Sequence, residues 1–265
     1  QLPDDSTNNS AGTIVGNPQV VAGLRGNALQ FDGVDDGINI PDSANINTGG
    51  PWTNRTVIAM FKCDDVDKPG KQTIFEEGGQ TRGITIYVSG GLLYGAAWNR
   101  AEYNWNGAWL STPINSNNWY GVAVVIRDGT AAVEPDKFEM WLDGRLIATA
   151  PGGQLYGHGN DNGIGYTTQN NVFHDGNASP ATGHYFQGAI DEVWILNEAL
   201  TQTQLGGFVG KVWPFAFGPT PRDGAIYQNT WVSLDWKPGG FAVSHDVYMG
   251  DNFEDVNAGT ADTFR

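Results

Sequence analysis

The most informative part of the chain is the stretch Tyr185-Phe186-Gln187-Gly188-Ala189-Ile190-Asp191-Glu192-Val193-Trp194-Ile195-Leu196-Asn197-Glu198-Ala199-Leu200. Its apolar residues are spaced for a strand with a break near Asp191. Asp191 and Glu192 place two carboxylates inside this strand, and a buried Asp191 needs hydrogen-bond donors or a cation. The next residues, 201–208, predict one short helix that Thr201 caps and glycine ends.

The composition indicates an all-β chain. Of the 265 residues, 37 are glycine and 10 are tryptophan, and hydrophobic residues make up 40%. Glycine-rich turns between short aromatic strands are typical of all-β domains, and this hydrophobic content is sufficient for a packed core. The length fits one large sandwich, or one domain with an additional piece.

Short alternating segments, separated by turn signals about every 8–12 residues, predict a β-sandwich. Asp143-Gly144 is typical of a type I′ hairpin, and Gly90-Gly91 and Asp32-Gly33 indicate further turns between strands. Residues 1–19 are polar and predict a loop. The most apolar strand, 119–126, is expected in the centre of a sheet, and 55–62 is apolar on both faces. The expected strands are residues 28–31, 37–40, 55–62, 72–75, 83–89, 92–98, 119–126, 138–142, 146–150, 162–167 and the closing strand.

Three segments together resemble the laminin-G-like, concanavalin-A-like β-sandwiches. Residues 185–208 resemble the closing strand and helix of that family, residues 26–40 an early strand and turn, and residues 137–148 the central hairpin. The segments occur in the family's order. The resemblance implies an all-β, two-sheet antiparallel jelly roll of the bacterial secreted type, located outside the cell or at its surface and used for binding or cell adhesion.

The character of the sequence changes at Trp213, where a proline-rich linker begins. Residues 231–236 and 244–250 predict two alternating strands that resemble the opening of a fibronectin type III-like module. Such a module needs about 100 residues, whereas residues 213–265 supply 53 (265 − 212 = 53). We therefore expect a jelly roll over residues 1–212, followed by a linker and a partial module over residues 213–265.

The resemblance also implies a strand ahead of the loop at residues 1–19. The sequence does not supply it, so one sheet edge is expected to be empty or filled by another chain. An alternative function is therefore a structural or adhesive surface protein whose neighbouring subunits join by β-strand addition.

The formal net charge of −15 disfavours nucleic acid as a partner, because phosphate binding requires basic clusters. It also disfavours anionic membranes. No stretch of about eighteen apolar residues is present, so no membrane span is expected. Cys63 is the only cysteine, which excludes an intramolecular disulfide. The sequence shows neither a signal peptide nor an initiator Met, and we expect a mature or excised fragment.

Calcium is the cofactor that the resemblance implies. The family often holds a structural calcium with a carboxylate from the closing strand and carbonyls near the early strand. Asp191 matches that carboxylate, and Asp32 lies in the matching early turn. Calcium takes about six to eight oxygen ligands. The alternative is that Asp32 caps its own turn and Asp191 accepts hydrogen bonds from backbone amides.

A carbohydrate site is indicated by the aromatic-rich segment 98–109, which interleaves rings with amides and one arginine. A flat ring suits the apolar face of a sugar, while amide and charged groups suit its hydroxyls. Tyr103 and Trp105 are the rings that we expect to be exposed. Trp98 and Trp109 are expected in the core or at strand ends.

A second polar loop, residues 156–162, is expected to line the same face and to leave His158 solvated. A polysaccharide or glycan is therefore the expected partner. The ligand-binding candidates are Trp98, Arg100, Tyr103, Trp105, Trp109 and His158.

A catalytic alternative comes from Glu134-Pro135-Asp136-Lys137-Phe138-Glu139, which fits the Glu-x-Asp-x-x-Glu pattern of the β-glucanases that share this sandwich. In those enzymes two carboxylates about 5 Å apart act as nucleophile and acid/base. Pro135 occupies a position where a central ladder needs an N–H donor, so Glu134 is expected in a loop and Glu139 on the surface. These two residues are weak catalytic candidates, and a binding module without catalysis is the preferred function.

Overall fold

The computed structural model divides into two compact units, Gln1–Lys211 and Val212–Arg265. The described residues are 8, 10–176, 178–179, 182–208, 217–220, 226, 231–237, 244, 246–259 and 263.

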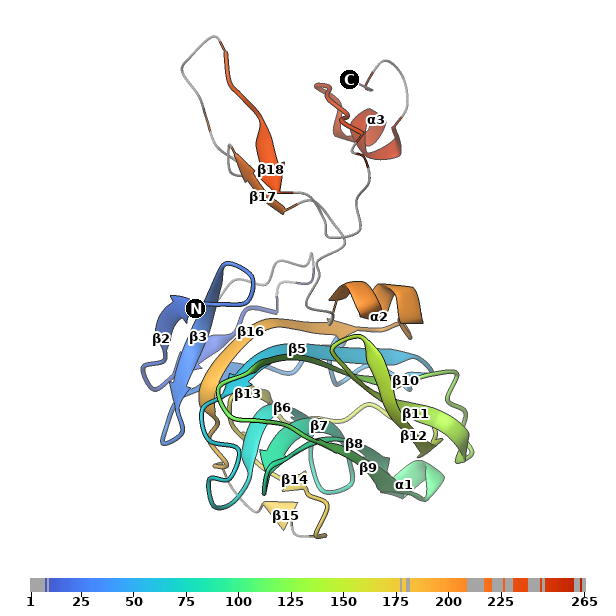
Figure 1. The fold of residues 1–265 in the computed structure, drawn as a ribbon. Helices are drawn as coiled ribbons and strands as arrows, with labels where there is room; N and C mark the ends of the chain where they lie inside the picture. The colour runs from blue at the N-terminus through green and yellow to red at the C-terminus, as the bar shows by residue number, and fades with distance from the viewer. Residues whose placement is uncertain are drawn as a thin grey trace. The chain divides into compact units, whose positions relative to one another are not determined.

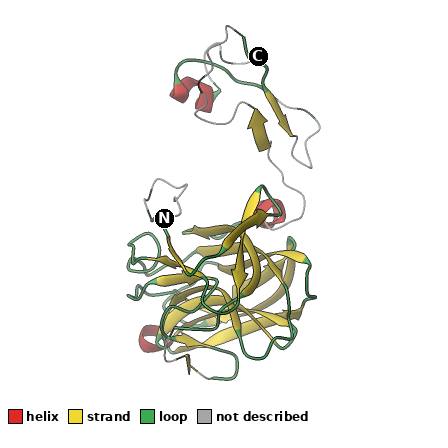
Figure 2. Ribbon diagram, turned by 90° about the vertical axis from the view of Figure 1, so that its left-hand side faces the viewer, coloured by secondary structure: helices red, strands yellow, loops and turns green. Residues whose placement is uncertain are grey.

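The first unit is a sandwich of two antiparallel sheets with seven strands each (Figure 1). Figure 2 shows the same two layers of strands from the side. This architecture confirms the expected all-β jelly roll. In spatial order, the first sheet contains β1 (Thr13–Val15), β4 (Gly37–Ile40), β13 (Asn162–Ile164), β6 (Gln72–Gly78), β7 (Arg82–Ser89), β8 (Leu92–Asn99) and β9 (Trp105–Pro113). The second sheet contains β12 (Arg145–Gly152), β11 (Glu134–Leu142), β10 (Trp119–Ile126), β5 (Arg55–Cys63), β16 (Gln187–Leu196), β3 (Asn27–Asp32) and β2 (Gln19–Ala22).

The main core lies between the two sheets, where alternate residues of each strand point inward. A smaller apolar cluster, which includes Ile58, Trp141 and Leu205, lies on the outer face of the second sheet beneath α2 (Gln202–Phe208). Strand β5 is therefore buried on both faces, as the sequence predicts.

Thr201 caps helix α2, as expected. Its backbone N–H donates to Gln204 Oε1 at 2.8 Å, and the N–H of Gln204 donates to Thr201 Oγ1 at 3.4 Å, which is the reciprocal arrangement of a capping box. The expected stop at glycine is wrong, because the helix continues through Gly206 and Gly207 to Phe208.

The two hairpin predictions with glycine turns are confirmed. Strands β7 and β8 pair across Gly90-Gly91, and β11 and β12 pair across Asp143-Gly144. Asp143 and Gly144 have φ angles of 48° and 77°, as a type I′ turn requires. The turn at Asp32-Gly33 differs, because β3 and β4 lie in different sheets and the chain there crosses the sandwich edge.

Residues 13–15, predicted as loop, form strand β1 at the edge of the first sheet. Ile14 pairs with Ile38 of β4, and Val15 pairs with Gly37. The run of β-branched residues from Thr13 to Val15 favours a strand despite its polar surroundings. The position beside β4 is thus occupied by the chain itself.

Strand β16 lies between β3 and β5 and contains the predicted break. Its register with β5 shifts between Asp191 and Trp194, where one additional residue is accommodated as a β-bulge. Glu192 has a φ angle of 49° at this point.

The second unit contains a short ladder between β17 (Phe217–Thr220) and β18 (Asp235–Lys237), and helix α3 (Phe253–Ala258). Only the end of the strand expected at residues 231–236 coincides with β18. Residue 245 of the strand expected at residues 244–250 lies outside the described residues, and the fibronectin type III-like module stays a prediction.

No helix among the residues that the structure describes is long and apolar enough to cross a membrane.

Candidate functional site

Two tyrosine rings meet at one end of the sandwich. Tyr103 ends helix α1 (Arg100–Tyr103), which connects β8 to β9, and its ring is partly exposed. Tyr156 lies between β12 and β13, and 41% of it is exposed. The two ring centroids are 6.3 Å apart at an angle of 68°. The rings therefore offer an accessible aromatic surface made from two distant parts of the chain.

Charged side chains border this aromatic surface. Arg82 forms an ion pair with Glu102, and its guanidinium lies 5.4 Å from the centre of the Tyr156 ring. The ion pair raises the pKa of Arg82 and lowers the pKa of Glu102. Arg100 donates to the carbonyl oxygens of Asn106 at 3.1 Å and Gln80 at 3.4 Å. We name the group Arg82, Arg100, Glu102, Tyr103 and Tyr156 the tyrosine patch.

Arg82 and Glu102 are members of the patch that were not among the residues expected from the sequence. They are 20 positions apart, but Arg82 pairs with Asn99 across the β7–β8 hairpin, and helix α1 follows directly. The turn at Gly90-Gly91 fixes that register. In that register Arg82 lies opposite Asn99, the residue directly before α1.

Trp105 is buried, with 2% exposed, although it was expected to be an accessible ring. It packs against Phe138 in the core, with ring centroids 6.0 Å apart. Its strand position opposite Asn99 turns its side chain toward the second sheet. Trp98 is fully buried and donates to the carbonyl of Gly79 at 2.8 Å, and Trp109 is partly buried beside it.

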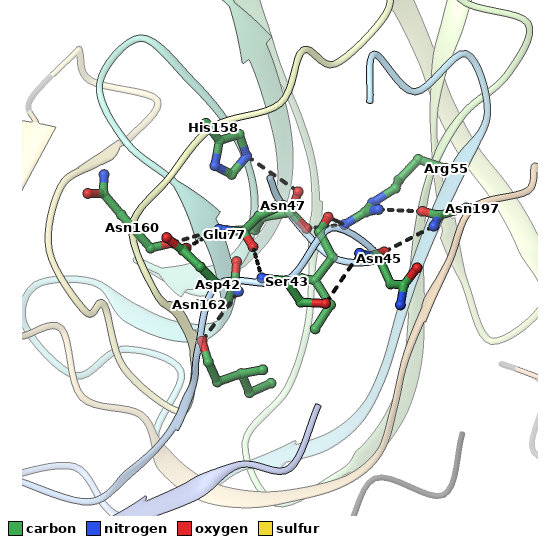
Figure 3. A network of polar contacts seen from close by, with 12 residues as sticks. Asp42, Ser43, Asn45, Asn47, Arg55, Glu77, His158, Asn160, Asn162 and Asn197 are labelled. Carbon is green, nitrogen blue, oxygen red and sulfur yellow. Dashed lines mark hydrogen bonds and ion pairs between the residues drawn. The ribbon is translucent and has the colours of Figure 1, made fainter. Parts of the chain in front are cut away.

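His158 is also buried, with 9% exposed, and the expectation of a solvated histidine is wrong. Its Nε2 lies 3.4 Å from Glu77 Oε1, and its backbone N–H donates to the carbonyl of Asn47 at 2.8 Å. Figure 3 shows these residues in one polar network with Arg55.

Residues 166–176 cover the outer face of the first sheet, and we call them the cover segment. It contains β14 (Asn171–Val172), which pairs with β15 (Ala178–Ser179). The Phe173 ring packs edge-on against Tyr87 at 4.9 Å, and Trp109 donates to the carbonyl of Val172 at 3.4 Å. Rings on this face are thus packed against the chain itself.

Glu76 lies beneath the cover segment with 1% exposed. Its Oε1 accepts hydrogen bonds from the backbone N–H and the hydroxyl of Thr168, at 2.8 and 2.5 Å. Burial raises the pKa of Glu76 to about 8, with the charges of Glu77 and Asp161 acting in the same direction and the Thr168 hydrogen bonds opposing it. This carboxyl therefore holds its proton at neutral pH.

The two expected calcium ligands do not come together. Asp32 pairs with Gln187 of β16, and Asp191 is four residues further along that strand. At about 3.3 Å per residue the separation is about 13 Å, too far for one ion. Asp191 accepts a hydrogen bond from the N–H of Arg25 at 3.0 Å, and burial raises its pKa.

A second acidic group surrounds Asp32. Carboxylate oxygens of Asp32, Asp35 and Asp36 lie within 4.8 Å of one another. Asp32 Oδ1 accepts from the N–H of Val34 at 2.8 Å, which lowers the pKa of Asp32, and Asp36 Oδ1 accepts from the N–H of Asn17 at 2.6 Å. A cavity of about 380 Å³ lies beside this group. Its lining also includes Gln19, Gln30, Phe31, Asp64 and Gln187. These hard oxygen donors fit calcium.

The two weak catalytic candidates are also separated. Glu134 and Glu139 are five residues apart on β11, about 16 Å along a strand. Glu139 is buried rather than exposed, because Arg127 and Trp141 donate to its two oxygens at 2.6 and 2.8 Å. A register shift between Glu134 and Phe138 accommodates Pro135. This arrangement differs from the close pair of a retaining glycosidase.

The two stacked seven-stranded sheets define the class of jelly-roll β-sandwiches. Residues 32–206 match the family described as the concanavalin A-like lectin/glucanases superfamily, Laminin_G_3. The match covers more than half of the chain, and the chain belongs to this family. A search of curated protein sequences gives no match.

Solved structures share the fold at low sequence identity. The receptor binding domain of botulinum neurotoxin C/D mosaic serotype is 14% identical, with a TM-score of 0.56 over 77% of this chain and 47% of that one. The binding domain of botulinum neurotoxin DC in complex with SialylT is 11% identical, with a TM-score of 0.56 over 77% and 46%. The chain thus spans about half the length of these toxin domains.

Domain 4 of AbnA, an extracellular arabinanase from Geobacillus stearothermophilus, was solved in complex with arabinotriose. It is 16% identical, with a TM-score of 0.52 over 75% of this chain and 88% of that one.

Proposed function

We propose that this chain is a non-catalytic, extracellular glycan-binding module and that the tyrosine patch is its binding surface. The observation that carries the proposal is the exposed Tyr156 ring, which lies beside Tyr103 and is bordered by the ion pair of Arg82 and Glu102. An aromatic face next to charged groups offers apolar contact and hydrogen bonds to a sugar at the same time.

The neighbours named above support this proposal without identifying the sugar. Domain 4 of AbnA, most of which is matched, was solved with arabinotriose, and the toxin binding domain, about half of which is matched, was solved with SialylT. A fold hosts many functions, and the argument therefore depends on the patch.

Replacing Tyr156 with alanine should weaken glycan binding about tenfold or more, because an exposed aromatic anchor contributes a large share of the binding free energy. Tyr103→Ala should have a smaller effect, since its ring is more covered. The measurement is titration calorimetry with a panel that includes arabinotriose, a sialylated trisaccharide and soluble polysaccharides.

Trp194→Ala is a matched control, because Trp194 is exposed to a similar extent, 37%, but lies on β16 of the second sheet. It should bind like the wild type. Equal loss in Trp194→Ala and Tyr156→Ala, or no loss in either, would argue against the tyrosine patch.

We also propose a structural calcium, held by the acidic group of Asp32, Asp35 and Asp36 rather than by Asp191. Bound calcium would neutralise the repulsion among these carboxylates and stabilise the crossing from β3 to β4. Calcium at 5 mM should therefore raise the melting temperature relative to EDTA, and Asp35→Asn should reduce the shift. An equal melting temperature with calcium and with EDTA would refute this assignment.

Assembly through sheet edges is the second candidate function. Val20 on the edge strand β2 is 69% exposed, and Leu146 on the edge strand β12 is 48% exposed. Exposed apolar residues on edge strands favour strand addition. In this second candidate function, neighbouring subunits also complete the partial fibronectin type III-like module. Light scattering after size exclusion separates it from a monomeric binding module.

A further inference from the structure

We propose that His158 is a positioning residue for the tyrosine patch. Together with Glu77 and Arg55 it fixes the loop that presents Tyr156, without contacting the glycan itself. This inference depends on the proposed glycan-binding function.

The chain is anchored immediately before Tyr156. The N–H of Trp52 donates to the carbonyl of Leu155 at 2.8 Å, and the N–H of Leu155 donates back to Trp52 at 3.2 Å. Leu155 is itself fully buried in the core. Tyr156 therefore begins from a fixed backbone position.

The chain is anchored again immediately after Tyr156. Gly157 packs so closely against Gly49 that a β-carbon would collide with the Gly49 carbonyl oxygen. The N–H of His158 donates to the carbonyl of Asn47. Only the exposed Tyr156 side chain lies free of these anchors.

The His158 anchor reaches into a buried ionic cluster (Figure 3). Glu77 Oε1 lies near His158 Nε2, and Glu77 Oε2 pairs with Arg55; both members of that pair are fully buried. Burial alone would raise the pKa of Glu77, but Arg55 and His158 outweigh it and lower the pKa. Glu77 thus carries a buried charge that pairs with Arg55 and lies 3.4 Å from His158 Nε2.

Asn47 ties the same cluster to the remainder of the loop. Its amide donates to Asp42 Oδ1 at 2.5 Å and to the carbonyl of Asn160 at 2.8 Å, and its side-chain oxygen accepts from the N–H of Ser43 at 3.0 Å. Asn47 therefore holds residues 158 and 160 against the turn at residues 42–48. The loop conformation follows from this network.

The network fixes geometry more than it contributes stability. Buried ion clusters are often no more stabilising than apolar residues of the same size. Among the described residues, both ring nitrogens of His158, Glu77 Oε1 and Asn162 Oδ1 are buried without a hydrogen-bond partner, so His158 Nε2 and Glu77 Oε1 are in close polar contact at 3.4 Å without a hydrogen bond. An apolar residue in place of His158 should therefore preserve the fold but allow the loop that carries Tyr156 to adopt other conformations.

The experiment compares His158→Leu and His158→Gln, with arabinotriose and a sialylated trisaccharide as probes in calorimetry. His158→Leu should raise Kd about tenfold, whereas His158→Gln, whose amide keeps a polar N–H group facing Glu77, should stay within about threefold of the wild type. In the Tyr156→Ala background, His158→Leu should add no further loss, because both changes remove the same ring contact.

A ligand-free measurement tests the anchor directly. Hydrogen exchange of the backbone amides at positions 155 and 158 should accelerate in His158→Leu, while the amides of β5 and β10 should exchange as in the wild type. Glu139→Gln, which changes an ion pair on the second sheet, is the control and should leave positions 155 and 158 protected.

The outcomes separate the two proposals. If Tyr156→Ala weakens binding and His158→Leu does not, or if His158→Leu weakens binding equally in the Tyr156→Ala background, the positioning role is wrong and the binding surface stands. Unchanged exchange at positions 155 and 158 also overturns the positioning role. A wild-type chain that binds neither probe overturns both proposals for these sugars.

Discussion

Glu77→Gln should lower the free energy of unfolding by about 3–5 kcal/mol, because removal of one partner leaves the other charge of a buried pair uncompensated. Arg55 and Glu77 bridge the two sheets from β5 and β6, and both side chains are fully buried. Arg55 also donates to Asn197 Oδ1 and the carbonyl of Ile46, and it stacks 4.4 Å from the Trp52 ring. Its guanidinium therefore cannot turn toward solvent. Urea unfolding followed by near-ultraviolet circular dichroism measures the change.

Two further variants make this test specific. Glu139→Gln breaks an ion pair whose arginine side chain is 30% exposed, and we expect a smaller loss of about 1–2 kcal/mol. The double variant Arg55→Met/Glu77→Leu removes both charges and should recover much of the loss. If Glu77→Gln lowers the free energy of unfolding no more than Glu139→Gln does, Arg55 and Glu77 do not form the buried, interdependent charge pair described here.

Glu76→Gln should stabilise the fold above neutral pH. The pKa of Glu76 is raised from 4.5 to about 8, so the folded state keeps a proton that the unfolded chain has released. The resulting stabilisation is complete below pH 4.5 and is lost as the pH rises to about 8. One pKa unit corresponds to about 1.4 kcal/mol, so the wild type loses about 3–5 kcal/mol across this window.

The glutamine variant cannot ionise, and its side-chain oxygen still accepts from Thr168. Its unfolding free energy should therefore lack this decrease, and the two curves should diverge between pH 5 and pH 9. The control is Glu134→Gln, whose side chain lies near the surface and bonds to Thr130 at 2.9 Å. Parallel pH curves for the wild type and Glu76→Gln would show that Glu76 does not titrate in this window.

Local sequence signals predicted several turns and strands, because the residues concerned act over short distances, whereas β1, β2 and β9 were not among the expected strands. Asp143-Gly144 can close a type I′ turn regardless of what surrounds it, and Thr201 with Gln204 caps a helix by contacts within one turn. The sheet switch after Asp32 was not predictable in this way. Whether a turn closes a hairpin or crosses between sheets depends on strands elsewhere in the chain.

The site was harder to predict, because exposure is a tertiary property. Trp105 and Tyr103 occur in the same aromatic segment, but the strand register turns Trp105 inward while the short helix carries Tyr103 to the surface. The burial of His158 is not predictable from the sequence for a related reason. Its loop is polar and glycine-rich, yet Glu77 and Asn47 offer buried acceptors that no local pattern reveals.

Because β16 lies between β3 and β5, the second sheet can be completed only late in the synthesis of the chain. Both neighbours leave the ribosome more than 120 residues before β16 does, and they cannot pair across the vacant position. Until residue 196 has emerged, the second sheet consists of two separate pieces with exposed inner edges. Closing such long loops is slow, and the incomplete sheet resembles the intermediates that chaperones bind. The nascent chain is therefore prone to aggregation until β16 has been synthesised and has paired with β3 and β5.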